Sequence, residues 1–174
     1  MKTGIEIVAV EDTSDDNGCD WIAGAVRTGE LDVISVNDMV SKVIARCGGK
    51  KIQNLYVIGH AAPGDQSVGA GQAVDTTGQK ALTIDEGKGK LFGDAETHLA
   101  RLRGKFAPEA VVTLGGCEVA KGEKGKALLR RISTVLGNVR VEGGDTLQNA
   151  LPGMEGNVIR CMGNTCWVES AAWF

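Results

Sequence analysis

The sequence AVVTLGGCEVAKGEKG, residues 110–125, decides the fold class because a strand and a helix meet within it. Residues 110–114 form an apolar run typical of a strand buried on both faces, and the glycines that follow end this strand. Over residues 124–136, apolar side chains recur every three or four positions, and Gly137 marks the end of this amphipathic helix. A buried strand that leads into an amphipathic helix predicts an α/β fold with a mostly parallel sheet.

The same alternation of strand and helix extends outward along the chain. Ser35 followed by Asp38 has the form of a capping box and predicts a helix that ends at Gly48. Residues 31–36 therefore suit either a strand or the approach to that helix. The pattern also predicts a short helix at residues 21–26 and strands at residues 4–10, 55–58, 81–84 and 139–141.

The second half of the chain holds three further features. Residues 61–93 are polar and rich in glycine, which fits a functional loop, a small hairpin insert or disorder. Asp94 is expected to begin a helix that Pro108 stops. Residues 158–161 and 166–168 flank the turn sequence MGNT and predict a C-terminal β-hairpin.

Length and composition limit the classes of protein and partner. The length of 174 residues favours a single domain over residues 1–174, expected as a three-layer α/β/α sandwich. The net charge of −3 argues against nucleic acid or an anionic membrane as the main partner. With no apolar run of membrane-helix length and no evident signal peptide, a cytoplasmic location is expected, and export without a cleaved signal is the alternative.

The cysteines predict thiols rather than cross-links. The chain has five of them, at Cys19, Cys47, Cys117, Cys161 and Cys166, which is an odd and scattered set. Cys161 and Cys166 are expected to face each other across the C-terminal hairpin, and two reduced thiols are the favoured interpretation. Because the chain has no CxxC pair and two histidines, no metal site is expected. No phosphate loop or dinucleotide fingerprint is present, so no cofactor is expected either.

Two residues capable of nucleophilic chemistry, His60 and Cys117, come shortly after buried strands. Parallel strands present their carboxyl ends at one edge of a sheet, so imidazole and thiol meet there if the two strands are neighbours. A thiolate nucleophile needs a base and a site for the oxyanion. The backbone N–H groups of Ala61, Gly116 and Cys117 are the expected oxyanion donors.

These residues resemble a known family. The runs HAAPG, residues 60–64, and GCEVAKG, residues 116–122, are similar to the His-Gly-Ser-Pro-Gly and Gly-Cys-x-Val-Ala-x-Gly runs of bacterial caspase-like domains, in clan CD of the cysteine peptidases. The similarity covers roughly residues 50–145, and the His-to-Cys separation of about 57 residues is close to the roughly 50 of caspases. The resemblance implies a hydrolase, a cysteine endopeptidase that cleaves protein or peptide substrates with Cys117 as nucleophile and His60 as general base.

One position departs from this pattern, because Ala61 stands where the family has glycine. Alanine keeps the backbone N–H but tolerates a positive φ poorly. This change favours a second hypothesis, a catalytically silent binding or scaffold module on the same fold. A flavodoxin-like small-molecule binder is a third hypothesis, which the missing phosphate loops disfavour.

The resemblance also implies where substrate specificity is set. In caspase-like enzymes the loop after the first strand and the residues around the nucleophile shape the pocket for the residue before the cut. Here these positions carry carboxylates, namely Glu11, Asp12, Asp15, Asp16 and Glu118. Such a pocket would favour Arg or Lys through charge-assisted hydrogen bonds, and a solvated acidic loop is the alternative.

A basic cluster follows the nucleophile on the predicted helix. It consists of Lys121, Lys124, Lys126, Arg130 and Arg131. We interpret it as a solvated helix face, because long basic side chains commonly cover exposed helix surface. A polyanionic regulator bound there, as in some caspase-like toxin domains, is the alternative that the resemblance implies.

Overall fold

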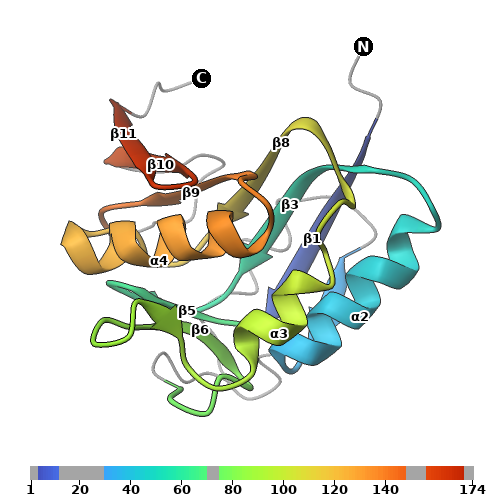
Figure 1. Cartoon of the computed structure of the whole chain (residues 1–174), viewed down its shortest axis with the longest axis horizontal. Coiled ribbons are helices and arrows are strands. Elements are labelled where there is room, and N and C mark those ends of the chain that lie inside the picture. Colours follow the sequence, from blue (N-terminus) through green and yellow to red (C-terminus); the bar gives the residue numbers. More distant parts are fainter. Residues whose placement is uncertain (1–3, 12–29, 70–74, 148–155, 171–174) are drawn as a thin grey trace.

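The computed structural model describes residues 4–11, 30–69, 75–147 and 156–170 of the chain. Within them the chain forms a mixed α/β fold around a seven-stranded central sheet, with a smaller four-stranded sheet beside it (Figure 1). The central sheet has the strand order β11-β10-β9-β8-β3-β1-β2. Its strands are β1 (Ile5–Glu11), β2 (Leu31–Val33), β3 (Ile52–Ile58), β8 (Phe106–Leu114), β9 (Arg140–Gly144), β10 (Asn157–Met162) and β11 (Thr165–Ser170).

Most of the central sheet is parallel, as the alternation of strand and helix predicts. β1 pairs in parallel with β2 and β3, β3 with β8, and β8 with β9, whereas β10 and β11 are antiparallel. Val57 of β3 lies opposite Leu114 of β8, so the two strands that precede His60 and Cys117 are neighbours. A helix between two such strands returns the chain to the same end of the sheet, which keeps the strands parallel.

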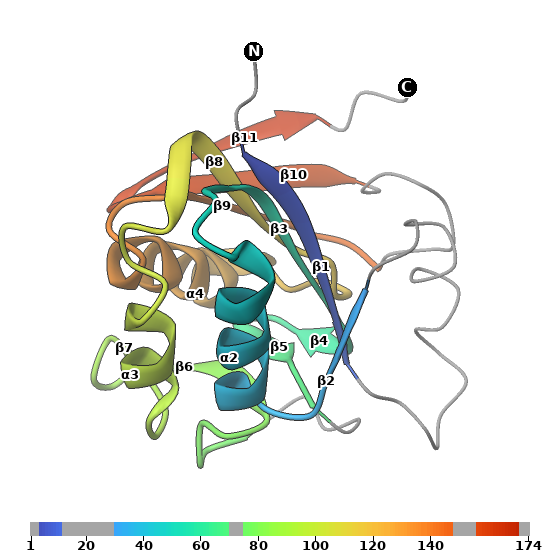
Figure 2. The ribbon, with the colours of Figure 1, turned by 90° about the vertical axis from the view of Figure 1, so that its right-hand side faces the viewer.

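The helices of the described residues all lie on one face of the central sheet (Figure 2). They are α2 (Val36–Cys47), α3 (Ala95–Ala100) and α4 (Gly122–Val135). Ile7 and Ala9 of β1 point into the main core that these helices cover. Val8, Val10 and Ile58 form a second, smaller apolar cluster. Because side chains alternate along a strand, this cluster belongs to the opposite face. No helix of the described residues covers that face, and the second helical layer of the expected sandwich stays a prediction.

α2 shows how local sequence sets an element's bounds. Ser35 Oγ accepts a hydrogen bond from Asp38 N–H at 3.1 Å, and Gly48, with a φ of 52°, ends the helix. The Asp38 carboxylate accepts a hydrogen bond from Ile34 N–H at 3.2 Å. In a standard capping box this donor would be the N–H of the N-cap residue, Ser35. Residues 31–33 form β2, so the segment before the helix is a strand.

The helix predicted before Pro108 is shorter than expected, and Pro108 does not end it. α3 stops at Ala100, and a turn then leads to Gly104, whose φ of 71° reverses the chain. Pro108 lies in β8, where the register against β3 jumps from Phe106 to Val111. The proline is exposed in this bulge, where a missing N–H costs no ladder hydrogen bond.

Of the three interpretations of residues 61–93, the small hairpin insert describes what the structure contains there. Four short antiparallel strands form the small sheet, and β6 is the strand predicted at residues 81–84. They are β4 (Ala61–Ala62), β5 (Asp65–Ser67), β6 (Ala81–Asp85) and β7 (Lys90–Leu91). Leu82 and Ile84 of β6 belong to the main core, so the insert is part of the packed structure.

The predicted C-terminal hairpin is confirmed, and its cysteines require a correction. Cys161 of β10 lies opposite Cys166 of β11, as expected. The two residues form a disulfide, so the prediction of two reduced thiols is wrong. Directly opposed residues of antiparallel strands bring their Cβ atoms close enough for a disulfide, and this local geometry outweighs the odd cysteine count. Cys47 and Cys117 take no part in a disulfide.

Two sequence predictions, Cys19 as a thiol and a helix at residues 21–26, lie outside the described residues. Across the described part of the chain, no helix combines the length and the apolar character needed to cross a membrane.

Candidate active site

The carboxyl ends of β1, β3 and β8 meet at one edge of the central sheet, beside the small sheet (Figure 1). His60 follows β3 at this edge and Cys117 follows β8. The pairing of the two strands continues into the loops, because Gly115 N–H donates to Val57 O at 2.8 Å. The sheet thus presents both predicted residues at the same edge.

Gly116 is the point where the two loops touch. A Cβ built on Gly116 would lie 2.2 Å from the Cβ of Ala61 and 3.0 Å from the carbonyl oxygen of Gly59. Neither neighbour is the end of a flexible side chain, so no larger residue fits at this position. Ala61 adjoins His60 and Gly116 adjoins Cys117, and the contact therefore joins the loop that holds the imidazole to the loop that holds the thiol.

Glu11, expected in the acidic loop after the first strand, is instead a buried residue of this site. It is the last residue of β1 and only 2% exposed, so it is not part of an acidic loop facing a substrate. Its Oε2 accepts a hydrogen bond from His60 N–H at 2.9 Å, and its Oε1 accepts from Ser67 Oγ at 2.5 Å. The carboxylate fixes the backbone at His60. A carboxylate that directly extends an apolar strand run was the available signal for this role.

Buried polar atoms without partners concentrate at this edge. Among the described residues, four buried side-chain polar atoms have no hydrogen-bond partner, and three of them are His60 Nε2, Asp65 Oδ2 and Gln66 Oε1. Burial raises the pKa of Asp65 to about 6, and a hydrogen bond from Thr83 and the charge of Lys124 oppose this rise only in part. Unsatisfied buried groups are rare in proteins and typically mark a functional site or a place for water.

The predicted oxyanion donors lie beside the Gly116 contact. Ser67 N–H donates to His60 O at 2.8 Å, which makes Ala61 and Gln66 a non-hydrogen-bonded pair of the β4–β5 ladder. The N–H of Ala61 therefore points away from β5. Within the described residues, neither this group nor the N–H of Gly116 donates to a backbone oxygen. Cys117 is the next residue of the same loop and is half-buried.

Of the other residues predicted to recognise substrate around the nucleophile and in the acidic loop, the structure describes Glu118. Asp12, Asp15 and Asp16 lie outside the described residues. Glu118 adopts a φ of 54° and its carboxylate forms an ion pair with Lys121 at 2.5 Å. Its backbone N–H donates to Thr146 O at 2.8 Å. The charge of Glu118 is therefore partly balanced by its own loop.

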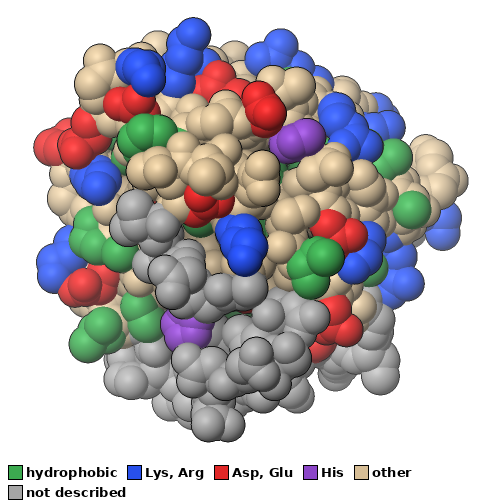
Figure 3. All heavy atoms as spheres, turned by 90° about the horizontal axis from the view of Figure 1, so that it is seen from below, with side chains coloured by type: hydrophobic (Ala, Val, Ile, Leu, Met, Phe, Trp, Pro, Cys, Tyr) green, Lys and Arg blue, Asp and Glu red, His purple; other side chains and the backbone are tan. Residues whose placement is uncertain are grey.

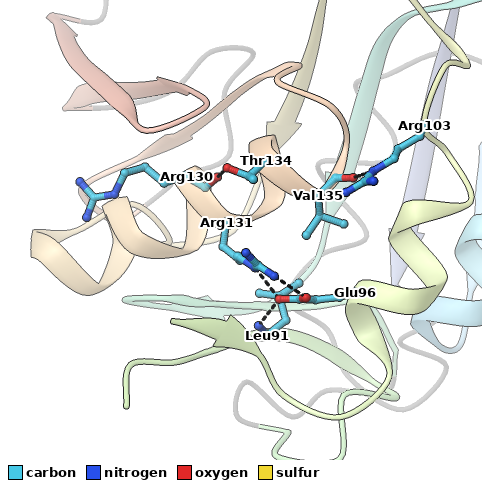
Figure 4. A network of polar contacts seen from close by, with 7 residues as sticks. All are labelled: Leu91, Glu96, Arg103, Arg130, Arg131, Thr134 and Val135. Carbon is cyan, nitrogen blue, oxygen red and sulfur yellow. Dashed lines mark hydrogen bonds and ion pairs between the residues drawn. The ribbon is translucent and has the colours of Figure 1, made fainter. Parts of the chain in front are cut away.

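Most of the basic cluster is already paired with carboxylates. Lys126 and Arg130 contact Glu123 at 2.8 and 3.8 Å. Arg131 binds Glu96 of α3 through two hydrogen bonds of 2.5 and 2.6 Å (Figure 4). On the face seen in Figure 3, acidic and basic side chains alternate without a large patch of one sign. These ion pairs fit the interpretation of a solvated helix face, and a polyanionic regulator stays a prediction.

The fold and this site define a mixed α/β protein with a histidine and a cysteine at the carboxyl edge of a mostly parallel sheet. In the described part of the chain, no group of three or more His, Cys, Asp or Glu side chains is arranged to hold a metal ion. The family model DUF4347, a domain of unknown function, matches residues 22–148. The chain therefore belongs to the DUF4347 family, and both His60 and Cys117 lie within the matched region. No curated protein and no solved structure matches the chain significantly.

Proposed function

We propose that this protein is a cysteine endopeptidase of caspase-like fold, a hydrolase that cleaves protein or peptide substrates with a Cys117–His60 dyad. The observation that carries the proposal is the contact between Gly116 and Ala61, which joins the loops of the thiol and the imidazole. The three-layer, single-domain architecture of that fold is part of the proposal, and the described helices form one of its outer layers.

The first half of the reaction makes an acyl-enzyme. Cys117 Sγ attacks the scissile carbonyl carbon, and His60 accepts the thiol proton and passes it to the leaving amine as the C–N bond breaks. The oxyanion of the tetrahedral intermediate takes hydrogen bonds from the N–H groups near Ala61, Gly116 and Cys117. Glu11 supports this step by holding the backbone of His60.

A second function is favoured by the side chain of Ala61. Its methyl group lies against Gly116, at a place that a glycine in the resembling family would leave open. A catalytically silent binding module would use the same edge of the sheet without using the thiol. In that case Cys117 is a packing residue at a loop that binds a partner.

A peptide-library assay separates the two functions. We expect the wild type to cleave part of a fluorogenic peptide library, and Cys117→Ala and His60→Ala to lose this cleavage by a factor on the order of 1,000 or more. The two losses should not add in the double variant, because the residues act as one unit. Cys47→Ala is the matched control, since Cys47 is a buried thiol of α2 away from the site.

The same library tests the acidic pocket. Cleavage after Arg or Lys would support the hypothesis that carboxylates recognise the residue before the cut. Preference for Asp or a large apolar residue at that position would contradict this hypothesis. A folded protein that cleaves no peptide, with Cys117 no more reactive than Cys47, would contradict the peptidase and favour the binding module.

A further inference from the structure

Gln66 is a residue of this edge whose role neither the fold nor the dyad explains. It lies on β5 and is completely buried. Its Nε2 donates to Ser67 O at 3.0 Å and to His60 O at 3.5 Å. Only the nitrogen end of a carboxamide can donate to two carbonyls, so these bonds fix which way the side chain faces.

The oxygen end of Gln66 faces the nucleophile loop. Gln66 Oε1 lies 2.8 Å from the position that a Cβ on Gly116 would take, one residue before Cys117. This atom is buried and has no donor among the described residues. A buried acceptor left unpaired destabilises the fold, which a protein tolerates where a bound molecule supplies the donor.

Because Gln66 is buried, only a small molecule can reach its Oε1 atom and donate a hydrogen bond to it. A water molecule is small enough to reach a fully buried oxygen and needs two or more polar partners to stay there. His60 Nε2 is a second unpartnered buried atom at the same edge. A carboxamide oxygen and an unprotonated imidazole nitrogen are both acceptors, so a water molecule placed between them would donate one hydrogen bond to each.

We propose that Gln66 is a positioning residue that, together with His60, holds the water that hydrolyses the acyl-enzyme. This inference rests on the proposed peptidase function. The water oxygen attacks the thioester carbonyl carbon while His60 Nε2 takes one of its protons. The C–S bond breaks as the tetrahedral intermediate collapses, Cys117 recovers the proton from the imidazolium, and the carboxylic acid leaves.

The test separates formation of the acyl-enzyme from its hydrolysis, with p-nitrophenyl acetate as the probe. Acylation of Cys117 releases one equivalent of nitrophenolate in a burst, and hydrolysis of the thioester sets the steady rate. In Gln66→Met, which keeps the length of the side chain, we expect an unchanged burst. The steady rate should fall on the order of 10- to 100-fold, as expected when a reacting group is mispositioned. Acetyl-Cys117 should then accumulate and be detected by mass spectrometry.

Two further variants keep the proposal falsifiable if Gln66→Met disturbs the fold. Gln66→Glu keeps an acceptor oxygen, and at pH 5.5, where a buried carboxyl is largely protonated, its steady rate should recover to within about 3-fold of the wild type. Gln53→Met removes another buried glutamine, on β3, whose Nε2 donates to Glu109 O, and should change neither phase. Equal losses in both phases, or an unchanged steady rate in a folded Gln66→Met, would overturn the role of Gln66. A wild type with no burst and no acetyl-Cys117 would overturn the peptidase itself.

Discussion

Two hairpins of this protein differ in how completely their side chains are paired. The β10–β11 hairpin is cross-linked by a disulfide, and Arg160 ties it to β9 through Glu142 at 2.8 Å and to Glu169 of β11. The β4–β5 hairpin, which follows His60, holds two buried polar atoms without a partner in the described residues, Asp65 Oδ2 and Gln66 Oε1. None of the unpaired buried atoms in the described residues belongs to β10 or β11.

We interpret the contrast as one between a region that stabilises the sheet and the region of the proposed active site. Native proteins normally provide hydrogen-bond partners for their buried polar groups, and unpaired groups occur most often at functional sites. The β4–β5 hairpin lies at the carboxyl edge of the parallel strands, where ligands of such sheets bind. The C-terminal hairpin lies at the antiparallel side of the central sheet and lends it stability.

The largest effect on this contrast should come from Gly116→Ala. The added Cβ would lie 2.2 Å from Ala61 Cβ and force the two loops apart, at an expected cost of about 3 kcal/mol in the free energy of unfolding. Urea unfolding measures this, and alkylation of Cys117 should slow in the same variant. Gly87→Ala is the control, because its nearest neighbour is 3.4 Å away, and it should stay within about 0.5 kcal/mol of the wild type. Equal effects of both substitutions would contradict the tight contact.

Asp65→Asn should stabilise the protein, because it removes a buried carboxylate charge from the β4–β5 hairpin. The pKa of Asp65 is raised from 3.8 to about 6 by burial, so the folded state binds its proton more tightly than the unfolded state does. The wild type should therefore lose stability as pH rises between about 4 and 6, and keep that loss above pH 6. At about 1.4 kcal/mol per pKa unit, the variant should be more stable by about 2–3 kcal/mol at pH 7.5. A difference between variant and wild type that is the same at pH 4 and pH 7.5 would refute this account.

Reducing the disulfide should weaken the other hairpin without touching the site. A closed loop as short as that between Cys161 and Cys166 predicts a loss of about 2 kcal/mol in the unfolding free energy. Urea unfolding with and without dithiothreitol measures the difference, and peptide mapping without reductant should recover these two cysteines as one linked pair. The proposed separation of roles fails if reduction also abolishes the reactivity of Cys117.

The smallest effect should come from the ion pair that fastens α4 to α3. A double-mutant cycle on Glu96→Gln and Arg131→Met should give a coupling of about 1 kcal/mol, because the pair is bidentate but partly exposed. Hydrogen bonding to Arg131 lowers the pKa of Glu96, so the coupling should be complete above pH 5 and vanish as pH falls through the lowered value. A coupling that persists once Glu96 is protonated would show that charge is not its source.

The sequence predicted what depends on local pattern. The strands before His60 and Cys117, the cap of α2 at Ser35 and the terminal hairpin each follow from the periodicity or turn chemistry of a few adjacent residues. The sequence-based predictions were wrong where the structure depends on segments that are distant in the chain. The bulge around Pro108 depends on the register of β8 against β3, which the residues of β8 alone do not encode.

The site divides in the same way. Glycines after two buried strands predicted where His60 and Cys117 emerge, because strand ends are local features. The roles of Glu11 and Gln66 depend on partners from other parts of the chain. Glu11 acts through His60 and Ser67, and Gln66 is placed against Gly116. Polar side chains of these types are usually exposed, so composition and spacing gave no reason to place Gln66 inside, whereas the apolar run that ends in Glu11 offered a local signal.

The central claim is that His60 and Cys117 act as one pair, and competitive alkylation tests it most directly. With limiting iodoacetamide, Cys117 should be labelled before the buried Cys47, and His60→Ala should slow labelling of Cys117 on the order of 10-fold or more while the protein stays folded. His98→Ala, at the other histidine on α3, should leave that rate unchanged. If His60→Ala leaves the alkylation rate of Cys117 as it is in the wild type, the two residues are not a pair and the claim is contradicted.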